Sequence, residues 1–389
     1  AGSSKESILK TFLTDKRAMR DYSWTDPLVY IDTTKTPRDS VRYYARFLQP
    51  GMMVMDPATG HILAWVGGID QEYFQYDHVQ LGKRQVGSTF KPFVYTAAFD
   101  NGFSPCHELL NVPVEVHVGE REDGSMEVWR PSNSDGSIGG CMTLRRALAM
   151  SVNIVTARVM KDIGPRVVRE YAYRMGITTK LDAVYSLALG TVDLSVYEMT
   201  SAYATFANGG VWNEPIFVTR IEDKFGNVLE QFKGKSREAL SPETAYLMVD
   251  MLRGVVNSGT AFGLKVNYGL DANIDIGGKT GTTQDHSDGW FMGITPYLTA
   301  GVWVGGEDRR VRFPTLAYGQ GGKMAMPIFG KFLKKVYDDQ ELSIPRTFFE
   351  RPRNLRVEID CAVYRRTHPG ECQPEGAVSD DDPRSMRFD

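Results

Sequence analysis

The chain has 389 residues, and at about 150 residues per domain this length predicts two to three structural units. Hydrophobic residues make up 42% and charged residues 24% of the sequence, a composition that excludes an intrinsically disordered chain. Forty-five Lys and Arg against 48 Asp and Glu give a net charge of −3, so the charge does not favour nucleic acid or an anionic membrane as the main partner.

The first 50 residues are polar and mixed. The chain starts at Ala1 without the apolar core of a secretory signal, and its apolar runs are far shorter than the roughly 20 residues of a membrane-spanning helix. We therefore expect a fragment or processed form whose membrane anchor has been removed. A short helix is predicted after Thr36-Pro37, and the apolar runs 52–55 and 61–66 flank a turn sequence and predict a β-hairpin.

From Ser88 to Asn101 the apolar residues recur at helical spacing, which predicts a helix. Residues 103–140 are rich in Gly, Pro, Ser and Glu and predict surface loops with a short ribbon. The helical period returns in five segments, at 144–150, 154–163, 166–175, 195–208 and 242–257. A strand pair is predicted over 219–232, followed by three strands at 274–283, 289–295 and 299–304, a helix at 326–337, and a Pro- and Arg-rich appendage with a loose tail beyond 343.

Two strands, a long helical middle and three further strands together predict an α+β fold. In such a fold the sheet is completed by segments that are remote in sequence.

Four cysteines, Cys106, Cys141, Cys361 and Cys372, lack the CxxC spacing of a zinc site. Their spacing fits two interpretations equally: Cys361 and Cys372 close a small loop in an oxidising compartment, or all four are unrelated thiols. Six scattered histidines contain no HExxH pair, so the sequence favours neither a metal nor a metalloenzyme.

Ser88-Thr89-Phe90-Lys91 places a hydroxyl and an amine three residues apart, on one face of a helical turn. A serine at a helix N-terminus lies in the positive end of the helix dipole, and its own N–H can face a developing oxyanion. Lys91 can act as the base for Ser88 only if burial or a nearby cation lowers its pKa. The motif alone is weakly specific, because Ser7-Ile8-Leu9-Lys10 fits it too and is expected to be an exposed amphipathic stretch.

Ser151-Val152-Asn153 lies between two predicted helices. Its simplest interpretation is a helix cap, with Asn153 capping the helix at 154–163. Capping by Asn153 leaves the Ser151 hydroxyl free for a second role.

Lys279-Thr280-Gly281-Thr282 lies in a run that alternates like a strand. A phosphate-binding loop is excluded because Asn273 stands where the first glycine of GxxxxGK[ST] would lie. On a sheet edge the Lys279 cation and the two threonine hydroxyls suit a carboxylate, and Gly281 lets a ligand backbone lie close to the strand.

In this order, the three motifs resemble those of the active-site serine penicillin-recognising enzymes, which comprise penicillin-binding proteins and serine β-lactamases. Val152 departs from the Asp that those β-lactamases often carry. Longer segments are similar to class A (bifunctional) penicillin-binding proteins over residues 36–340, namely 84–93, 56–60 with 66–68, 187–190, 202–210 and 279–283. The Glu-Asp-x-x-Phe-x-x-His motif of the class A glycosyltransferase has no counterpart in residues 1–50.

The resemblance implies the penicillin-binding and β-lactamase-like transpeptidase fold, with an antiparallel sheet flanked by helices and an all-helical subdomain. It also implies three parts. Residues 1–50 would be a linker or remnant after a missing glycosyltransferase domain, residues 51–343 a DD-transpeptidase domain, and residues 344–389 a C-terminal appendage and tail.

The resemblance further implies a serine DD-transpeptidase that needs no metal or organic cofactor. Its catalytic residues would be Ser88 as the nucleophile, Lys91 as the base, Ser151 as a proton relay, Asn153 as the ligand of the substrate amide and Lys279 as a second cation. Its substrate would be held by Thr280, Gly281 and Thr282. The N–H groups of Ser88 and Thr282 would form the oxyanion hole.

The implied partners are peptidoglycan stem peptides ending in D-Ala-D-Ala, an amine acceptor, β-lactams and cell-wall synthesis proteins, with no nucleic acid. The implied location is the periplasm at the outer face of the cytoplasmic membrane. There Cys106 and Cys141 could staple the 103–140 region that they flank. Trp129 of that region is a candidate contact at the rim of the cleft, although a lone Trp more commonly packs.

Three alternatives accompany the transpeptidase interpretation. A DD-carboxypeptidase would use water as the acceptor, and a β-lactam sensor domain would stay acylated without releasing product. A β-lactamase is disfavoured because no Glu-x-x-Asn sequence lies between Ser151 and Lys279.

Overall fold

The computed structural model describes residues 4–24, 30–120, 125–283, 285–370 and 372. Its centre is a five-stranded antiparallel sheet in the order β15-β16-β17-β3-β4. The strands are β3 (Leu48–Met55), β4 (Ile62–Val66), β15 (Gly277–Thr282), β16 (Asp288–Ile294) and β17 (Thr299–Gly306). The pairing of β3 with β17 joins the two ends of the domain, as the order of elements predicts.

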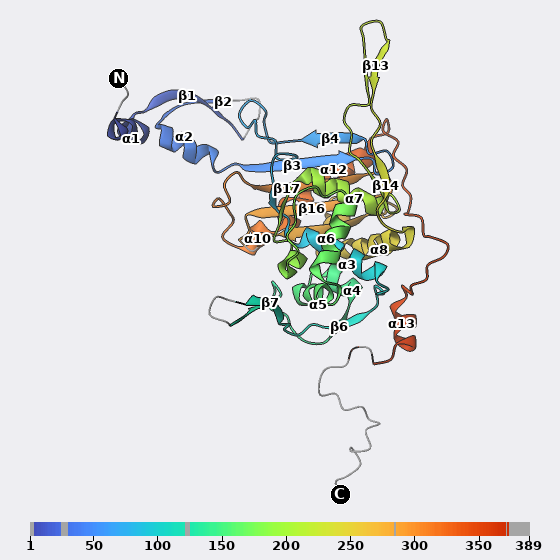
Figure 1. The fold of residues 1–389 in the computed structure, drawn as a ribbon. Helices are drawn as coiled ribbons and strands as arrows, with labels where there is room; N and C mark the ends of the chain where they lie inside the picture. The colour runs from blue at the N-terminus through green and yellow to red at the C-terminus, as the bar shows by residue number, and fades with distance from the viewer. Residues whose placement is uncertain (1–3, 25–29, 121–124, 284, 371, 373–389) are drawn as a thin grey trace.

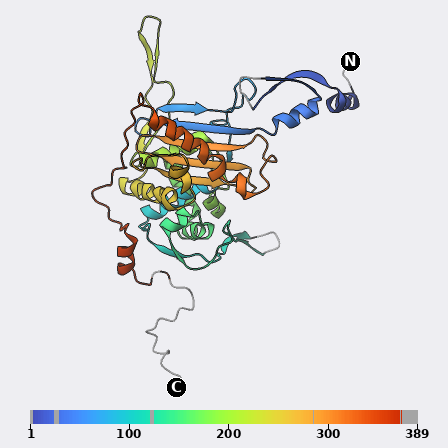
Figure 2. The same cartoon turned by 180° about the vertical axis from the view of Figure 1, so that it is seen from behind.

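Helices cover both faces of the sheet (Figures 1 and 2). Glycines in the strands make room for them. A Cβ at Gly301 would lie 2.2 Å from the Thr200 hydroxyl of α7 (Val196–Ala207), and a Cβ at Gly293 would lie 2.3 Å from Phe329 of α12 (Met326–Asp338). Since β16 and β17 are buried along their whole length, they form the core between these two helical layers.

The helical middle of the chain packs around α3 (Lys91–Asp100), in which every residue but the last is buried. The other long helices there are α5 (Asn153–Ile163), α6 (Pro165–Arg174) and α8 (Pro242–Ser258). Other short helical segments are η1 (Gly87–Phe90), α4 (Leu144–Ala149), η2 (Tyr185–Leu189), α9 (Gly263–Asn267), α10 (Leu316–Gly319) and α11 (Gly321–Met324). The predicted helices are confirmed.

The 103–140 region carries the expected short ribbon. Its strands are β6 (Glu108–Leu110), which pairs with β9 (Cys141–Thr143), and β7 (Val116–Glu120), which pairs with β8 (Met126–Trp129). Elsewhere β5 (Arg84–Gln85) pairs with β10 (Asp193–Leu194) and β11 (Val211–Asn213) with β14 (Ser236–Glu238). The predicted strand pair is β12 (Arg220–Glu222) with β13 (Val228–Gln231), a hairpin that projects from the body in Figure 1.

The N-terminal 48 residues contain more structure than the sequence predicted. The expected helix is α2 (Pro37–Tyr44), and it follows α1 (Lys5–Thr14) and the paired strands β1 (Arg17–Tyr22) and β2 (Tyr30–Lys35). Ser7 and Lys10 lie exposed on α1, as expected. Among the described residues, no helix is both long and apolar enough to cross a membrane.

After α12 the chain forms a strap, residues 344–370 and 372, which runs back across the helical middle. Glu243 at the start of α8 accepts hydrogen bonds from the backbone of Arg356 and Val357. The strap ends in the helix α13 (Cys361–Thr367). The loose tail predicted at 379–383 lies outside the described residues.

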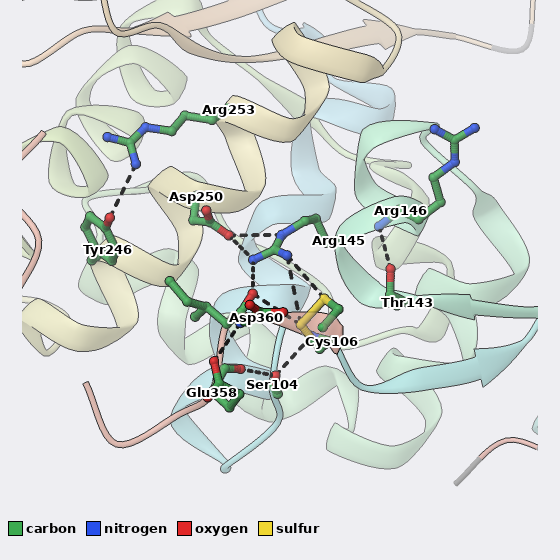
Figure 3. A network of polar contacts seen from close by, with 12 residues as sticks. Ser104, Cys106, Thr143, Arg145, Arg146, Tyr246, Asp250, Arg253, Glu358 and Asp360 are labelled. Atoms are coloured by element: carbon green, nitrogen blue, oxygen red, sulfur yellow. Dashed lines mark hydrogen bonds and ion pairs between the residues drawn. A yellow bond between two sulfur atoms is a disulfide. The ribbon is translucent and has the colours of Figure 1, made fainter. Parts of the chain in front are cut away.

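Two disulfides fasten the strap to the ends of the 103–140 region, Cys106–Cys361 and Cys141–Cys372. Both suggested pairings, Cys361 with Cys372 and Cys106 with Cys141, are therefore wrong, as is the interpretation of four unrelated thiols. The strap carries Cys361 and Cys372 back to Cys106 and Cys141, segments more than 200 residues earlier in the chain. Arg145 lies beside the first disulfide, where its guanidinium donates hydrogen bonds to the Asp250 carboxylate and to the carbonyl of Ile359 (Figure 3).

Candidate active site

The turn that carries Ser88 is held by main-chain contacts on several sides. Ser88 lies in the 3₁₀ turn η1, and Lys91 begins α3 directly after it, so the hydroxyl and the amine lie one turn apart. The N–H of Gly87 donates to the carbonyl of Gly190 (3.1 Å), and the Tyr203 hydroxyl donates to the carbonyl of Thr89 (2.7 Å). Gly190 and Tyr203 belong to segments that the sequence related to penicillin-binding proteins, and the structure shows that both hold the Ser88 turn.

A buried ion pair fastens the strand before this turn to the sheet. Arg84 donates from Nε to Oδ1 of Asp288 (2.6 Å), and the same oxygen accepts from the Trp303 indole (3.0 Å). This pair was not predicted, because Arg84 and Asp288 are 204 residues apart in the chain. Since Arg84 precedes Ser88 by four residues, we expect the Arg84–Asp288 pair to fix where the nucleophile turn meets the sheet.

Strand β15 lies directly against the Ser88 turn and forms one edge of the five-stranded sheet. A Cβ at Gly87, where φ is +52°, would lie 2.7 Å from the Thr282 carbonyl, and a Cβ at Gly281 would lie 2.8 Å from the Val86 carbonyl. These two glycines let the first motif and the third motif meet.

The Ser151 hydroxyl lies between the side-chain nitrogens of two lysines. Lys279 Nζ donates to Ser151 Oγ over 2.9 Å, and Lys91 Nζ approaches the same oxygen at 3.3 Å. Lys91 also donates to Asn153 Oδ1 (2.7 Å) and to the Ser151 carbonyl (2.5 Å). Ser151 adopts a positive φ of 59°, which is unusual for a residue other than glycine and is held here by these contacts. The structure thus brings together residues of all three motifs.

Burial shifts the titration of both lysines. Burial, with the nearby charge of Lys279 as a second cause, lowers the pKa of Lys91 well below its ordinary value. Burial lowers the pKa of Lys279 to about 7. An amine with a lowered pKa loses its proton more readily near neutral pH, which is the property that a general base for a serine requires.

The threonines of β15 are oriented by neighbours from other elements. The Thr280 hydroxyl shares a 2.7 Å hydrogen bond with the Thr260 hydroxyl, and Thr282 Oγ1 accepts from the N–H of Gly321 (3.0 Å). Sequence reasoning missed Thr260 and Gly321, which lie outside the three motifs.

Asn153 does not cap its helix with its own side chain. It is the first residue of α5, and its backbone N–H donates to Oδ1 of Asn133 from the 103–140 region (2.8 Å). The interpretation of Asn153 as the helix cap is therefore wrong. Its side chain is instead engaged with Lys91 and with the carbonyl of Ser132.

Trp129, at the end of β8, is half-buried and packs against the apolar core. It lies opposite Val116 in the ribbon. Packing is the commoner role of a single Trp, and the rim contact stays a prediction.

Residues 51–334 match the family model described as the penicillin-binding protein transpeptidase domain, and residues 1–48 match that of the penicillin-binding protein middle domain. The chain belongs to the penicillin-binding protein transpeptidase family.

Within this family the chain is similar to class A penicillin-binding proteins. It is 33% identical to penicillin-binding protein 1A of Rickettsia felis over 84% of this chain and 42% of the relative. It is 34% identical to penicillin-binding protein 1A of Neisseria meningitidis over 74% of this chain and 36% of the relative. The chain thus spans about two fifths of the length of these curated relatives.

Solved structures show the same fold. Penicillin-binding protein 1A of Haemophilus influenzae superposes with a TM-score of 0.70 at 26% identity, over 79% of this chain and 49% of that chain. Penicillin-binding protein A of Mycobacterium tuberculosis, in its penicillin G acyl-enzyme complex, superposes with a TM-score of 0.57 at 19% identity, over 74% of each chain. The second likeness supports the fold alone. The expectation of a penicillin-binding transpeptidase fold is confirmed.

Proposed function

We propose that this chain is a serine DD-transpeptidase domain that cross-links peptidoglycan stem peptides and is acylated at Ser88 by β-lactams. The observation that carries the proposal is the contact network of Lys91, Ser151, Asn153 and Lys279 beside the Ser88 turn. It combines a serine nucleophile, a buried amine of lowered pKa and a hydroxyl that links this amine to a second one.

In the first step Ser88 Oγ bonds to the carbonyl carbon of the penultimate D-Ala. Lys91, as the neutral amine, accepts the Ser88 proton. The bond to the terminal D-Ala then breaks, and Lys91 gives the proton through Ser151 to the leaving nitrogen. This leaves an acyl-enzyme ester on Ser88 and free D-Ala.

The substrate is held by two kinds of contact. Because β15 is an edge strand, an extended peptide can lie along it, with its terminal carboxylate at Thr280 and Thr282 and its backbone close to Gly281. Asn153 holds the amide of the donor peptide. The N–H groups of Ser88 and Thr282 stabilise the oxyanion, since the packing of Gly87 on Thr282 brings their backbones together.

In the second step an amine from a neighbouring stem peptide attacks the ester carbon, the bond from that carbon to Ser88 Oγ breaks, and a proton of the amine passes to Ser88 Oγ through Lys91. This forms the cross-link and frees Ser88. Water in place of the amine would give DD-carboxypeptidase hydrolysis. We infer that the domain works at the outer face of the cytoplasmic membrane within a membrane-anchored protein that also contacts cell-wall synthesis proteins. The two disulfides support this location, because disulfides persist in oxidising compartments.

The test is intact-mass spectrometry during incubation with benzylpenicillin, followed by peptide mapping. A stable adduct on Ser88 that is absent from Ser88→Ala is the expected result. Rapid turnover of the drug without an adduct would point to a β-lactamase, and no reaction would overturn the assignment of Ser88.

A second assay separates transfer from its alternatives. The domain is incubated with a D-Ala-D-Ala stem peptide, with and without an amine acceptor. A cross-linked product supports the transpeptidase, hydrolysis alone supports the carboxypeptidase, and acylation by penicillin without any product from the peptide supports a sensor.

A further inference from the structure

Asn133, which lies outside the three motifs, makes a set of hydrogen bonds to the start of α5. Its side chain is buried, and Oδ1 accepts from the backbone N–H groups of Asn153 (2.8 Å) and Ile154 (3.0 Å). These two donors belong to the first turn of the helix, where N–H groups have no partner within the helix. Asn133 therefore caps α5 from a segment that precedes it by 20 residues.

The orientation of the Asn133 amide is fixed on its other side too. Nδ2 donates to Oδ1 of Asn111 (2.8 Å) and to the carbonyl of Ser137 (2.6 Å). An Asn amide offers two N–H donors and an oxygen that can accept twice, and here all four are used. A rotated amide would leave buried groups unsatisfied, so Asn133 has one stable orientation.

The same segment orients the Asn153 side chain. The neighbouring Ser132 carbonyl accepts from Nδ2 of Asn153 (2.8 Å), which leaves Oδ1 of that amide to accept from Lys91 Nζ (2.7 Å). Asn153 therefore contacts the buried Lys91 nitrogen with its side-chain oxygen, while its backbone N–H is held by Asn133.

We propose that Asn133 is a positioning residue for the acylation of Ser88, acting through Asn153 on Lys91. The inference rests on the proposed function, since it requires Lys91 to activate Ser88. It adds the 103–140 region to the machinery of the site, as the part that sets the position of the second motif against the first.

The test compares Asn133→Ala with a matched control, Asn213→Ala. Asn213, at the end of β11, is half-buried and donates to two backbone carbonyls of the β3–β4 turn, those of Pro57 (3.0 Å) and Ala58 (2.8 Å). The rate constant for acylation by benzylpenicillin is measured against pH for each variant, together with its thermal midpoint.

Asn133→Ala is expected to lower the acylation rate constant about 10- to 100-fold, because a small misplacement of a catalytic neighbour is costly. It is also expected to move the rise of the rate with pH to lower pH, because the Lys91 ammonium loses an acceptor. Asn213→Ala should change neither. Asn133→Asp keeps an acceptor for both N–H groups, but it loses the donors to Asn111 and Ser137 and places a carboxylate oxygen against their oxygens, so it should recover only part of the rate.

Two outcomes would overturn the proposal. One is a loss of rate in Asn133→Ala that Asn213→Ala reproduces at the same loss of thermal stability. The other is an unshifted pH profile. If Asn133→Ala does not fold, Asn111→Ala, which removes one anchor of the Asn133 amide, supplies the same comparison with a smaller expected loss. Wild-type protein that is not acylated at all would instead overturn the proposed function.

Discussion

The Arg84–Asp288 pair can be broken from its acidic side. The side chain of Asp288 is almost fully buried, and its carboxylate accepts from Arg84 (2.6 Å), from Trp303 (3.0 Å) and from the Ser287 hydroxyl (2.6 Å). Asp288→Ala removes all three acceptor contacts at once. The Arg84 guanidinium then stays buried, and among the described residues the Glu307 carbonyl remains as its hydrogen-bond acceptor.

The expected cost follows from the charge left behind. Removing one partner of a buried ion pair destabilises a protein by about 3–5 kcal/mol, because the other charge stays out of water without compensation. At about 2 °C per kcal/mol for a large domain, the thermal midpoint should fall by roughly 6–10 °C. Replacing both residues, as Arg84→Leu with Asp288→Ala, should cost much less than the sum of the two single changes, since no lone charge remains.

Urea unfolding followed by tryptophan fluorescence measures the loss of free energy, and a thermal melt measures the midpoint, both with the disulfides kept oxidised. Asp32→Ala is the matched control, because it removes the partner of Arg20 in an exposed pair and should leave the midpoint unchanged. A loss below about 1 kcal/mol for Asp288→Ala, or additive losses in the double variant, would refute the reasoning from buried charge.

Three further predictions concern catalysis, pH and the strap. Lys91→Arg cannot lose its proton, so acylation by benzylpenicillin should slow at least about 100-fold; an unchanged rate would exclude Lys91 as the base. Burial, with Arg84 as a second cause, lowers the pKa of His78 to about 4. The unfolded chain therefore binds this proton more readily, and stability should fall as pH drops from about 6.5 towards 4. His78→Phe should flatten that part of the urea stability profile, and equal slopes would contradict it. With Cys141–Cys372 closed, the Cys106–Cys361 bridge closes a ring through 106–141 and 361–372, so changing both its cysteines to Ser should cost about 4 kcal/mol in the same urea assay. An unchanged stability would contradict the idea that the Cys106–Cys361 bridge stabilises the fold by holding the strap.

Local patterns made much of the fold predictable. The hairpin at 52–66, the helices and the last three strands follow from hydrophobic period and turn residues. The three motifs are weakly specific one by one, and their union in one site follows from the resemblance to penicillin-recognising enzymes. Pairing of the first hairpin with the last strands follows from the order of elements.

The side-chain contacts and disulfides between distant segments were not predictable. The ring of Tyr22 in β1 lies 5.4 Å from that of Phe47 and 5.6 Å from that of Phe74, measured between centroids. The N-terminal strands are therefore stabilised by aromatic partners that their own polar sequence does not reveal. The cap of α5 belongs to Asn133 for a similar reason. The disulfide partners depend on the path of the strap, and spacing between cysteines carries no information about such a path.

The pairing of β3 with β17 has a consequence for how the chain is made. β3 ends at Met55, but its neighbour β17 begins at Thr299. More than two hundred further residues must therefore be synthesised before the edge of β3 is covered. Contacts between such distant segments fold slowly, and an uncovered strand is open to wrong pairing. The same wait applies to Ser88, whose surroundings are complete only when β15 arrives. A chain released early therefore carries its nucleophile but has no site around it.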